Sequence, residues 1–395
     1  MSISKKIIVI ILLVYSCKQD KLETEIESNS TSSAVENNTL FILIDSNQSN
    51  VTFNNHIEEN FDNFFAVFNY VYNGAGVAIG DINNDGLSDI YFTGNEVPNK
   101  LYLNKGNFKF EDITNSAGVS GGNGWHNGVV MADVNADGFL DIYICRGGKQ
   151  ATDTDRSNLL YINQGDATFI EQASAYGLDD TGYSIMASFF DADNDNDLDM
   201  FLTNRPNTFF MGYKQVLIGK EKQDGRFRDK LYINNDGNFK EVGIQSGIKN
   251  NFGYGLGLAT TDMNNDGKTD IYVSNDYLER DYLYINQGKN SFKDELTTRL
   301  NHIPFYAMGV DVVDFNNDGF EDIMQLEMMP EDYERSKTTM ASMNTKLFND
   351  MTTNGFHYQY MHNMLQLNRG KGIFSDIGQY SGLSKTDRLE LVMFR

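Results

Sequence analysis

The stretch DINNDGLSD, Asp81 to Asp89, decides how this chain of 395 residues folds, because four close copies of it follow. The copies are DVNADGFLD at 133–141, DADNDNDLD at 191–199, DMNNDGKTD at 262–270 and DFNNDGFED at 314–322. A motif that returns at intervals of roughly 50 to 70 residues indicates a repeat architecture rather than a series of unrelated domains.

Each copy stands between two apolar runs, and two further runs follow it. In the first unit the four runs are GAGVAIGD at 74–81, DIYFTG at 89–94, NKLYLN at 99–104 and FKFEDI at 108–113. All have the length of a strand, are rich in β-branched and aromatic residues, and are bounded by Gly, Asn or Asp. One unit is therefore predicted to be four short antiparallel strands, with the acidic loop between the first two.

A four-stranded unit with this period is typical of a β-propeller blade. We therefore predict an all-β chain whose residues 41–387 form a β-propeller of four-stranded antiparallel blades, about five of them. Gly-rich first strands suit the inner position of a blade, where neighbouring backbones approach closely. A β-solenoid or a string of separate β-modules is the alternative, but four strands per period is unusual for a solenoid.

The loops have the chemistry of a calcium site. Positions 1, 3 and 5 carry Asp or Asn oxygens, position 7 offers a backbone carbonyl, and position 9 is Asp in every copy. Hard oxygen ligands in this number select Ca²⁺ over softer metals. The candidate ligands are Asp81, Asn83, Asp85, Leu87 and Asp89; Asp133, Asn135, Asp137, Phe139 and Asp141; Asp191, Asp193, Asp195, Asp197 and Asp199; Asp262, Asn264, Asp266, Lys268 and Asp270; and Asp314, Asn316, Asp318, Phe320 and Asp322.

Position 6 is Gly in four loops and Asn196 in the third, where the chain must turn through a left-handed conformation. An EF-hand is excluded, because position 12 is never Glu and the flanks are strands. Five solvated turns without metal are the alternative, but several like charges in one turn need a cation. We expect up to five structural Ca²⁺ ions, bound with Kd on the order of 10⁻⁴–10⁻³ M, as in extracellular modules.

The chain is strongly acidic, with 55 Asp and Glu against 32 Lys and Arg and a net charge of −23. This balance excludes a nucleic-acid partner, because a phosphate backbone would be repelled. The sequence contains no P-loop or HExxH motif. Four residues separate His357 from His362. The two histidines are either a second metal site or ordinary packing residues, and packing is the favoured interpretation.

Two cysteines are too few for a disulfide framework. Cys145 ends an apolar run and is predicted to be a buried structural thiol. Cys17 follows a basic start and an apolar run at 7–15, and the stretch VYSC at 14–17 resembles a bacterial lipobox. We therefore expect a lipoprotein signal peptide at 1–16, a lipid on Cys17 and a disordered polar tether at 17–40. An ordinary signal peptide or anchor that contains a cysteine is the alternative.

The units resemble FG-GAP (VCBS) repeats, the calcium-loop blades of the integrin α-subunit propeller. The resemblance rests on residues 74–95, 98–119 and 328–372 and covers about 50–387. More closely, the chain is similar to Bacteroidetes lipoproteins that carry these repeats ahead of an ASPIC/UnbV domain, related to cartilage acidic protein. Residues 388–395, RLELVMFR, depart from that pattern and are expected to be an aberrant or truncated tail.

The resemblance implies an exported, calcium-binding propeller on the outer membrane or cell surface of a bacterium. We expect a non-catalytic binding or adhesion module with an extracellular protein or glycan ligand, held at the membrane by the N-terminal lipid. A polysaccharide lyase or hydrolase built on a calcium-binding propeller is the alternative, and it needs a clustered acid, base and charge neutraliser.

The connections between the second and third strands vary most in length, and they span 95–98, 147–157, 205–228, 276–280 and 328–362. In an antiparallel blade they lie on the face opposite the acidic loops. Long insertions are usually functional, so ligand contact is expected there. The candidate contact residues are Phe209, Phe210, Tyr213, Arg226, Phe356 and Tyr358. The alternative is that these insertions only cover the propeller or pack on another domain.

Overall fold

The structure is a computed structural model that describes residues 41–148, 152–207, 212–338 and 344–385. The predicted signal peptide, Cys17, the tether and the tail at 388–395 lie outside the described residues. From Ile44 onward, the described residues form one compact unit, and all the strands described below belong to it. In the described part of the chain, no helix combines the length and the apolar character that crossing a membrane requires.

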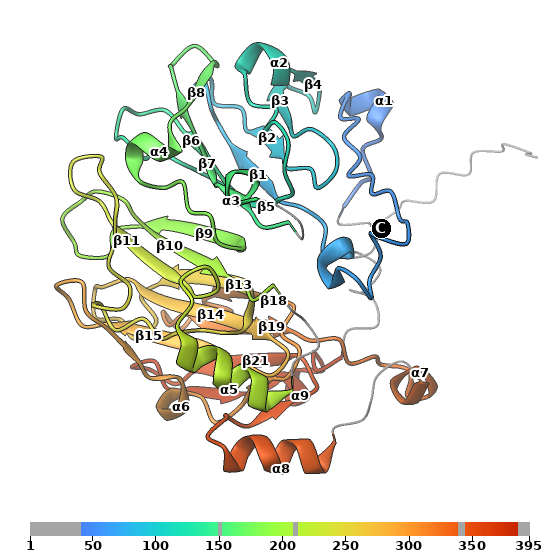
Figure 1. Cartoon of the computed structure of the whole chain (residues 1–395), viewed down its shortest axis with the longest axis vertical. Helices are drawn as coiled ribbons and strands as arrows, with labels where there is room; N and C mark the ends of the chain where they lie inside the picture. The colour runs from blue at the N-terminus through green and yellow to red at the C-terminus, as the bar shows by residue number, and fades with distance from the viewer. Residues whose placement is uncertain (1–40, 149–151, 208–211, 339–343, 386–395) are drawn as a thin grey trace, which may run out of the picture. The chain divides into compact units, whose positions relative to one another are not determined.

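Five four-stranded antiparallel sheets make up this unit (Figure 1). They are β1 (Val77–Gly80), β2 (Asp89–Phe92), β3 (Lys100–Asn104) and β4 (Phe110–Asp112); β5 (His126–Ala132), β6 (Asp141–Arg146), β7 (Leu159–Asn163) and β8 (Phe169–Glu171); β9 (Ser184–Phe190), β10 (Asp199–Asn204), β11 (Lys230–Ile233) and β12 (Lys240–Glu241); β13 (Tyr254–Thr261), β14 (Asp270–Asp276), β15 (Tyr282–Asn286) and β16 (Phe292–Asp294); and β18 (Gly309–Val313), β19 (Asp322–Leu326), β21 (Met364–Asn368) and β22 (Phe374–Asp376).

Within each sheet the strands lie in chain order, and an acidic loop joins the first strand to the second. In the first hairpin, Gly80 pairs with Asp89 and Val77 with Phe92, so the nonapeptide is the turn itself. The predicted all-β fold of four-stranded antiparallel blades, with five blades in the described residues, is confirmed.

The first strands of successive sheets are neighbours: β1 lies beside β5, β5 beside β9, β9 beside β13, and β13 beside β18. Glycine makes this approach possible. A Cβ atom on Gly128 would lie 2.5 Å from the carbonyl oxygen of Ile185 in the next first strand, and one on Gly76 would lie 2.8 Å from that of Asn127. The predicted crowding of the first strands is therefore present.

The hydrophobic core is divided into clusters that lie between consecutive sheets. The strand β6 contributes side chains to two of these clusters. In β6, Ile142 and Ile144 pack toward the first sheet, where they join Tyr91 and Leu101. Alternate residues of a strand point to opposite faces. Tyr143 and Cys145 accordingly pack toward the third sheet, with Met200 and Leu202. Every residue of β6 is buried, which explains its continuous apolar run.

Cys145 is thus the buried structural thiol that the sequence predicts, and burial raises the pKa of that thiol.

The outer faces of the first and the fifth sheet are more exposed to solvent than the faces between sheets. Val77 and Ile79 of β1 are 55% and 66% exposed, and Val313 of β18 is 51% exposed.

Short helical segments connect the strands. They are α1 (Ser46–Ser49), the 3-10 helix η1 (Asn69–Tyr72), α2 (Thr114–Ala117), α3 (Asp153–Arg156), α4 (Ala173–Tyr176), α5 (Tyr213–Lys222), α6 (Leu296–Arg299), α7 (Tyr333–Thr338), α8 (Thr345–Thr353) and α9 (Gly378–Ser381). A parallel pair of two-residue strands, β17 (Ile303–Pro304) and β20 (Gln359–Tyr360), joins the connection after the fourth sheet to the last insertion.

The insertions carry α3, α5, α7 and α8 and lie between the second and third strands, as predicted. We call the surface that they form the insertion face. Beneath it, α5 and α8 share an apolar cluster with the segment around η1 and with the beginnings of first strands. This cluster contains Phe68, Tyr70, Val71, Ile185, Val216, Tyr254, Leu278, Phe305, Met351 and Phe356. The insertions therefore build a core of their own.

Candidate metal centres and ligand-binding face

Each acidic loop is wound around its first aspartate. In the first loop, Asp81 accepts the N–H of Asp85 at 3.1 Å on Oδ1 and the N–H of Gly86 at 2.7 Å on Oδ2. Asp85 in turn accepts the N–H of Leu87 at 2.8 Å. The same bonds to the first and fifth residues recur in the other four loops. These bonds bring the predicted ligand positions 1 and 5 together in every copy.

The third loop is the most acidic, and its carboxylates converge most clearly. One carboxylate oxygen from each of Asp191, Asp193 and Asp195 lies within 4.8 Å of the others. Asn196 has φ of 73°, which confirms the left-handed turn predicted at position 6. Such a group of oxygens fits a Ca²⁺ ion, which takes six to eight oxygen ligands.

The aspartate at position 9 of each loop, a predicted metal ligand, also accepts two backbone hydrogen bonds. Asp89 is buried; its Oδ2 accepts the N–H of Ile82 at 3.0 Å, and its Oδ1 accepts the N–H of Asn104 at 2.7 Å. Asp141, Asp199, Asp270 and Asp322 repeat both bonds, to the second loop residue and to the asparagine that ends the third strand. This aspartate therefore fastens the loop to the third strand.

The asparagine that ends each third strand is a site residue that the ligand pattern does not contain. Asn163 donates from Nδ2 to the carbonyl of Leu140 at 3.1 Å, and also to the carbonyl of Ile82 in the preceding sheet at 2.8 Å. Asn286 and Asn368 make the same bond to the preceding sheet. The signal was present in the sequence, because Asn ends all five third runs.

Neighbouring loops also touch. Asn84 donates to the carbonyl of Gly138 at 2.9 Å, which joins the first loop to the second. Asn265 makes the equivalent bond to Gly319 between the fourth and fifth loops. Position 4 has positive φ in all five copies, including Ala136 at 58°, a requirement that the sequence analysis missed.

The pKa values of the buried aspartates at position 9 of the loops are raised. Burial is the main cause, hydrogen bonds oppose it, and the neighbouring carboxylates add to it; the pKa is about 6 for Asp141 and about 7 for Asp199 and Asp270. A bound divalent cation would lower these values, because it stabilises the ionised form. The residues present thus fit Ca²⁺, both in oxygen donors and in charge.

The fourth loop carries its own cation. The Nζ atom of Lys268, at position 7, lies 3.0 Å from Oδ2 of Asp266, a predicted ligand. The other loops have Leu, Phe or Asp at this position. Part of the charge in the fourth loop is therefore neutralised by the chain itself.

The insertion face contains only part of the predicted contact surface. Phe356 is buried in the apolar cluster, and Tyr213 packs edge-on against it at 6.5 Å between ring centroids. Tyr358 is exposed, and the exposed Arg226 forms an ion pair with Asp224 at 2.7 Å. Phe209 and Phe210 lie outside the described residues. The alternative, that insertion aromatics cover the sheets, holds for Phe356.

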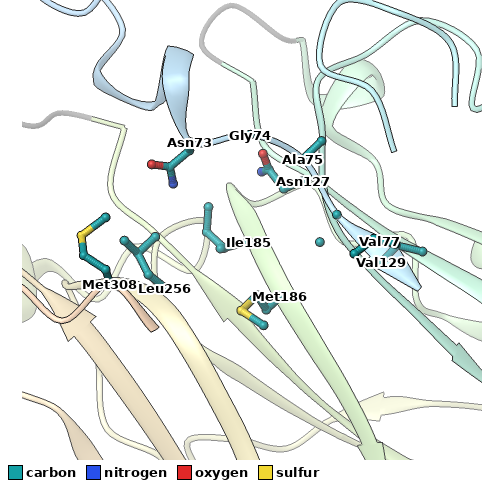
Figure 2. A pocket seen from close by; sticks show the side chains of 12 residues that line it. Asn73, Gly74, Ala75, Val77, Asn127, Val129, Ile185, Met186, Leu256 and Met308 are labelled. Carbon is teal, nitrogen blue, oxygen red and sulfur yellow. The ribbon is translucent and has the colours of Figure 1, made fainter. Parts of the chain in front are cut away.

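Described residues line cavities in this part of the molecule, and three of them bear on ligand binding. One of about 300 Å³ is lined by residues of the first strands, among them Val77, Val129 and Met186, and it has no ionisable side chain (Figure 2). A second, of about 580 Å³, is lined by Trp125 and Phe68 together with Asn60, Asp62, Asn63, Glu96, Asn123 and Asp155. The third, of about 630 Å³, lies along α5 and includes Lys222 and Phe227.

His357 and His362 do not form the pair that the alternative interpretation required. Nε2 of His357 lies 3.0 Å from the carbonyl oxygen of Leu300, and burial is the main cause of its lowered pKa. His357 is therefore a packing residue, as favoured from the sequence.

Comparison with known proteins agrees with the repeat pattern. The FG-GAP-like repeat family matches residues 81–144 and 262–324. Cartilage acidic protein 1 of Xenopus tropicalis is 29% identical over 244 residues, which are 61% of this chain and 35% of that protein. The proteins of the same name from Mus musculus and Homo sapiens are each 26% identical, over 61% of this chain and 35% and 34% of theirs.

The chain spans about a third of the length of these relatives. Among solved structures, an Agrocybe aegerita lectin whose title describes specific recognition of non-reducing terminal N-acetylglucosamine aligns with a TM-score of 0.41 and 18% identity, over 75% of this chain and 63% of the lectin. Residues 81–144 and 262–324 of the chain thus match FG-GAP-like repeats, and the chain is similar in sequence to cartilage acidic protein 1.

Proposed function

We propose that this protein is a calcium-stabilised extracellular module that binds a ligand on its insertion face and performs no chemistry on it. The cavity around Trp125 carries this proposal. It combines an aromatic ring with amide and carboxylate side chains in a space of about 580 Å³, which is large enough for a small ligand. Aromatic rings next to polar groups that accept and donate hydrogen bonds suit sugars and exposed protein side chains.

The acidic side chains that line the cavity favour a ligand without negative charge. Asp62, Glu96 and Asp155 line it, and the other lining residues that the structure describes include no basic side chain. An anionic glycan would be repelled there, as it would by the net charge of −23. A neutral glycan is therefore the first candidate ligand, and an extracellular protein with exposed amide or basic side chains is the second.

The cavity is built on rigid supports, which favours binding without rearrangement. Trp125 packs edge-on against Phe68 at 4.9 Å between ring centroids. Glu96 accepts the N–H of Glu58 at 2.8 Å and the side-chain amide of Asn63 at 2.7 Å. Side chains that are already held lose little conformational freedom when a ligand binds.

A lyase or hydrolase receives less support. A lyase needs a basic charge neutraliser beside a His or Tyr base. The described residues that line the three cavities include no His and no Tyr, and those that line the cavity around Trp125 include no Lys or Arg. We therefore assign the cavity to binding.

In the same proposal, the five acidic loops bind Ca²⁺ and stabilise the module. The first, third and fifth residues of each loop would hold Ca²⁺ through side-chain oxygens, and the ion would offset the repulsion among their carboxylates. We further propose that Cys17 carries a lipid and holds the module at a bacterial outer membrane or cell surface. Mass spectrometry of the mature N-terminus tests that anchor, and an unmodified Cys17 contradicts it.

The binding proposal is tested on a glycan array with the lipid-free chain in saturating Ca²⁺. We expect binding to neutral glycans that Trp125→Ala and Glu96→Gln abolish. Lys105→Ala is the matched control, because this exposed side chain lies in a turn beside the acidic loops and pairs only loosely with Glu111 at 3.5 Å. Unchanged thermal unfolding in Ca²⁺ shows that each variant is folded. Binding that survives Trp125→Ala in a folded protein places the ligand elsewhere.

A further inference from the structure

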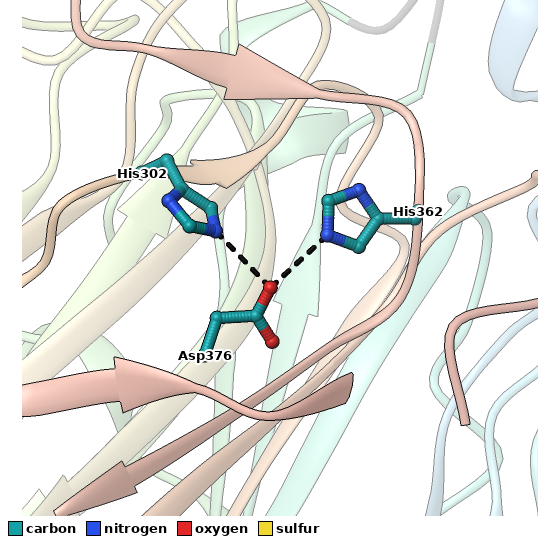
Figure 3. A group of neighbouring side chains, drawn as sticks. All are labelled: His302, His362 and Asp376. Atoms are coloured by element: carbon teal, nitrogen blue, oxygen red, sulfur yellow. Dashed lines mark hydrogen bonds and ion pairs between the residues drawn. The ribbon is translucent and has the colours of Figure 1, made fainter. Parts of the chain in front are cut away.

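Two histidines and one aspartate from distant parts of the chain meet at the last sheet (Figure 3). His302 lies between α6 and β17, His362 lies between β20 and β21, and Asp376 ends β22. The Nε2 atoms of both histidines lie 3.1 Å from the same oxygen, Oδ2 of Asp376. One ligand atom from each residue lies within 4.8 Å of the other two.

The three side chains are held in place from behind. The N–H of Gly378 occupies Oδ1 of Asp376 at 2.8 Å, which leaves Oδ2 to the histidines. Gln366 donates to the carbonyl of His302 at 2.9 Å, and the β17–β20 pair fixes the backbone next to both imidazoles. The ring of Tyr360 packs against His302 at 5.4 Å between centroids. The site is therefore preorganised.

The cluster is largely shielded from water. The side chain of Asp376 is 7% exposed, that of His362 17% and that of His302 27%. One carboxylate oxygen, Oδ2 of Asp376, thus faces the Nε2 atoms of both imidazoles in a site with little access to water, which is an arrangement that can receive a cation.

The distances have the scale of a metal site. Ligand atoms that surround zinc tetrahedrally at about 2.0–2.1 Å lie about 3.3 Å from one another. The two nitrogen–oxygen distances of 3.1 Å are close to this value, and all three ligand atoms lie within 4.8 Å of one another.

The donor set selects the class of ion. Imidazole nitrogens suit zinc and other first-row transition metals, whereas Ca²⁺ and Mg²⁺ prefer oxygen alone. We propose that His302, His362 and Asp376 bind a divalent first-row transition-metal ion, with Zn²⁺ as the ion to test. Three protein ligands leave a fourth position for water, as in sites where zinc meets a further ligand. The proposal does not depend on the binding function proposed above.

The position of the site gives the ion a structural effect. It would tie the connection after the fourth sheet and the last insertion to the outermost strand of the fifth sheet. These segments are separated by 60 and 74 positions along the chain, so a cross-link between them restricts the unfolded state strongly. Bound metal should therefore stabilise the end of the molecule that has one neighbouring sheet.

Calorimetric titration of the tag-free chain with Zn²⁺, in saturating Ca²⁺, tests the site. We expect one tight equivalent of Zn²⁺ per chain, and a rise in Tm when it binds. His302→Ala and His362→Ala should lose both effects. His56→Ala is the matched control, because His56 is an exposed histidine outside the cluster and its replacement should change neither.

A measurement on the unaltered chain covers the case in which a variant fails to fold. Co²⁺ bound by two imidazoles and a carboxylate in four-coordinate geometry should give intense visible absorption bands, and added Zn²⁺ should bleach them. Only weak bands typical of six oxygen ligands, or Zn²⁺ binding that is equally tight in a folded His302→Ala, His362→Ala double variant, would overturn the proposal.

Discussion

At the scale of single residues, the asparagine that ends each third strand contributes more than its position suggests. Asn163 is buried and uses its side-chain amide to join two sheets and its Oδ1 to accept the N–H of Gly165. Asn104, in the first sheet, makes the bonds within its own sheet, to Ser88 and Gly106. The two positions therefore differ by one bond between sheets and in burial, because Asn104 is only partly buried.

We expect Asn163→Ala to destabilise the protein more than Asn104→Ala. The difference should be about 1–3 kcal/mol, because the buried carbonyl of Ile82 loses its partner only in the first variant. Urea unfolding of both variants in saturating Ca²⁺ measures the difference. Equal losses in the two variants would show that the bond to Ile82 contributes nothing.

Ala136 offers a stabilising substitution at the same scale. It has φ of 58°, whereas the other four loops place Asn at this position. A left-handed conformation costs alanine about 1–2 kcal/mol, and asparagine tolerates it better. Ala136→Asn should therefore raise Tm in Ca²⁺, and Asn84→Ala should lower it, since it also removes the bond to Gly138. A lower Tm for Ala136→Asn contradicts this argument.

At the scale of elements, the five loops should not be equal. Lys268 places an ammonium group beside a ligand carboxylate, and it must be displaced or tolerated when Ca²⁺ binds. Replacing it with leucine, the residue found in the first loop, removes that competition.

We expect Lys268→Leu to strengthen Ca²⁺ binding at the fourth loop by up to about 1 kcal/mol, the upper range for exposed ion pairs. Calcium titration followed by Tm measures it. Lys293→Leu is the control, because it makes the same change of net charge at an exposed pair with Glu295 outside the acidic loops. A control that shifts the titration as much as Lys268→Leu would attribute the effect to net charge alone.

The elements also show what the sequence was able to predict. Strands, loops and insertions follow from local periodicity and turn residues, and the structure confirms their order. The bond from Asp141 to Asn163 and the meeting of His302 with His362 join residues far apart in the chain, and a local pattern does not reveal which distant residues meet. Insertion aromatics such as Phe356 were expected at the surface because no periodicity marks a core assembled from several insertions.

At the scale of the whole molecule, calcium should be a condition of stability. Without the ion, the buried Asp199 and Asp270 have a pKa of about 7, above the value of about 3.9 for an unfolded chain. The folded ion-free protein thus binds more protons than the unfolded chain between these two values. The stability that these two carboxyl groups contribute in their protonated form is fully present below pH 4 and is lost as pH rises toward and through 7.

We therefore expect Tm to fall when Ca²⁺ is removed, and to fall further at pH 8 than at pH 5.5. Bound Ca²⁺ takes the place of the protons, so the loaded protein should change less across this range. Calorimetry in buffers freed of metal on a chelating resin, with and without added Ca²⁺, gives both values. A Tm that is independent of Ca²⁺ at pH 8 would remove calcium from the proposed function.

The strand β6 carries a consequence for how this sequence can evolve. Its alternate residues belong to different cores, Ile142 and Ile144 to one side and Tyr143 and Cys145 to the other. Neighbouring residues of this hexapeptide are therefore selected for packing against different sheets. In an alignment of homologues, changes at 142 and 144 should co-vary with positions 91 and 101, and changes at 143 and 145 with positions 200 and 202.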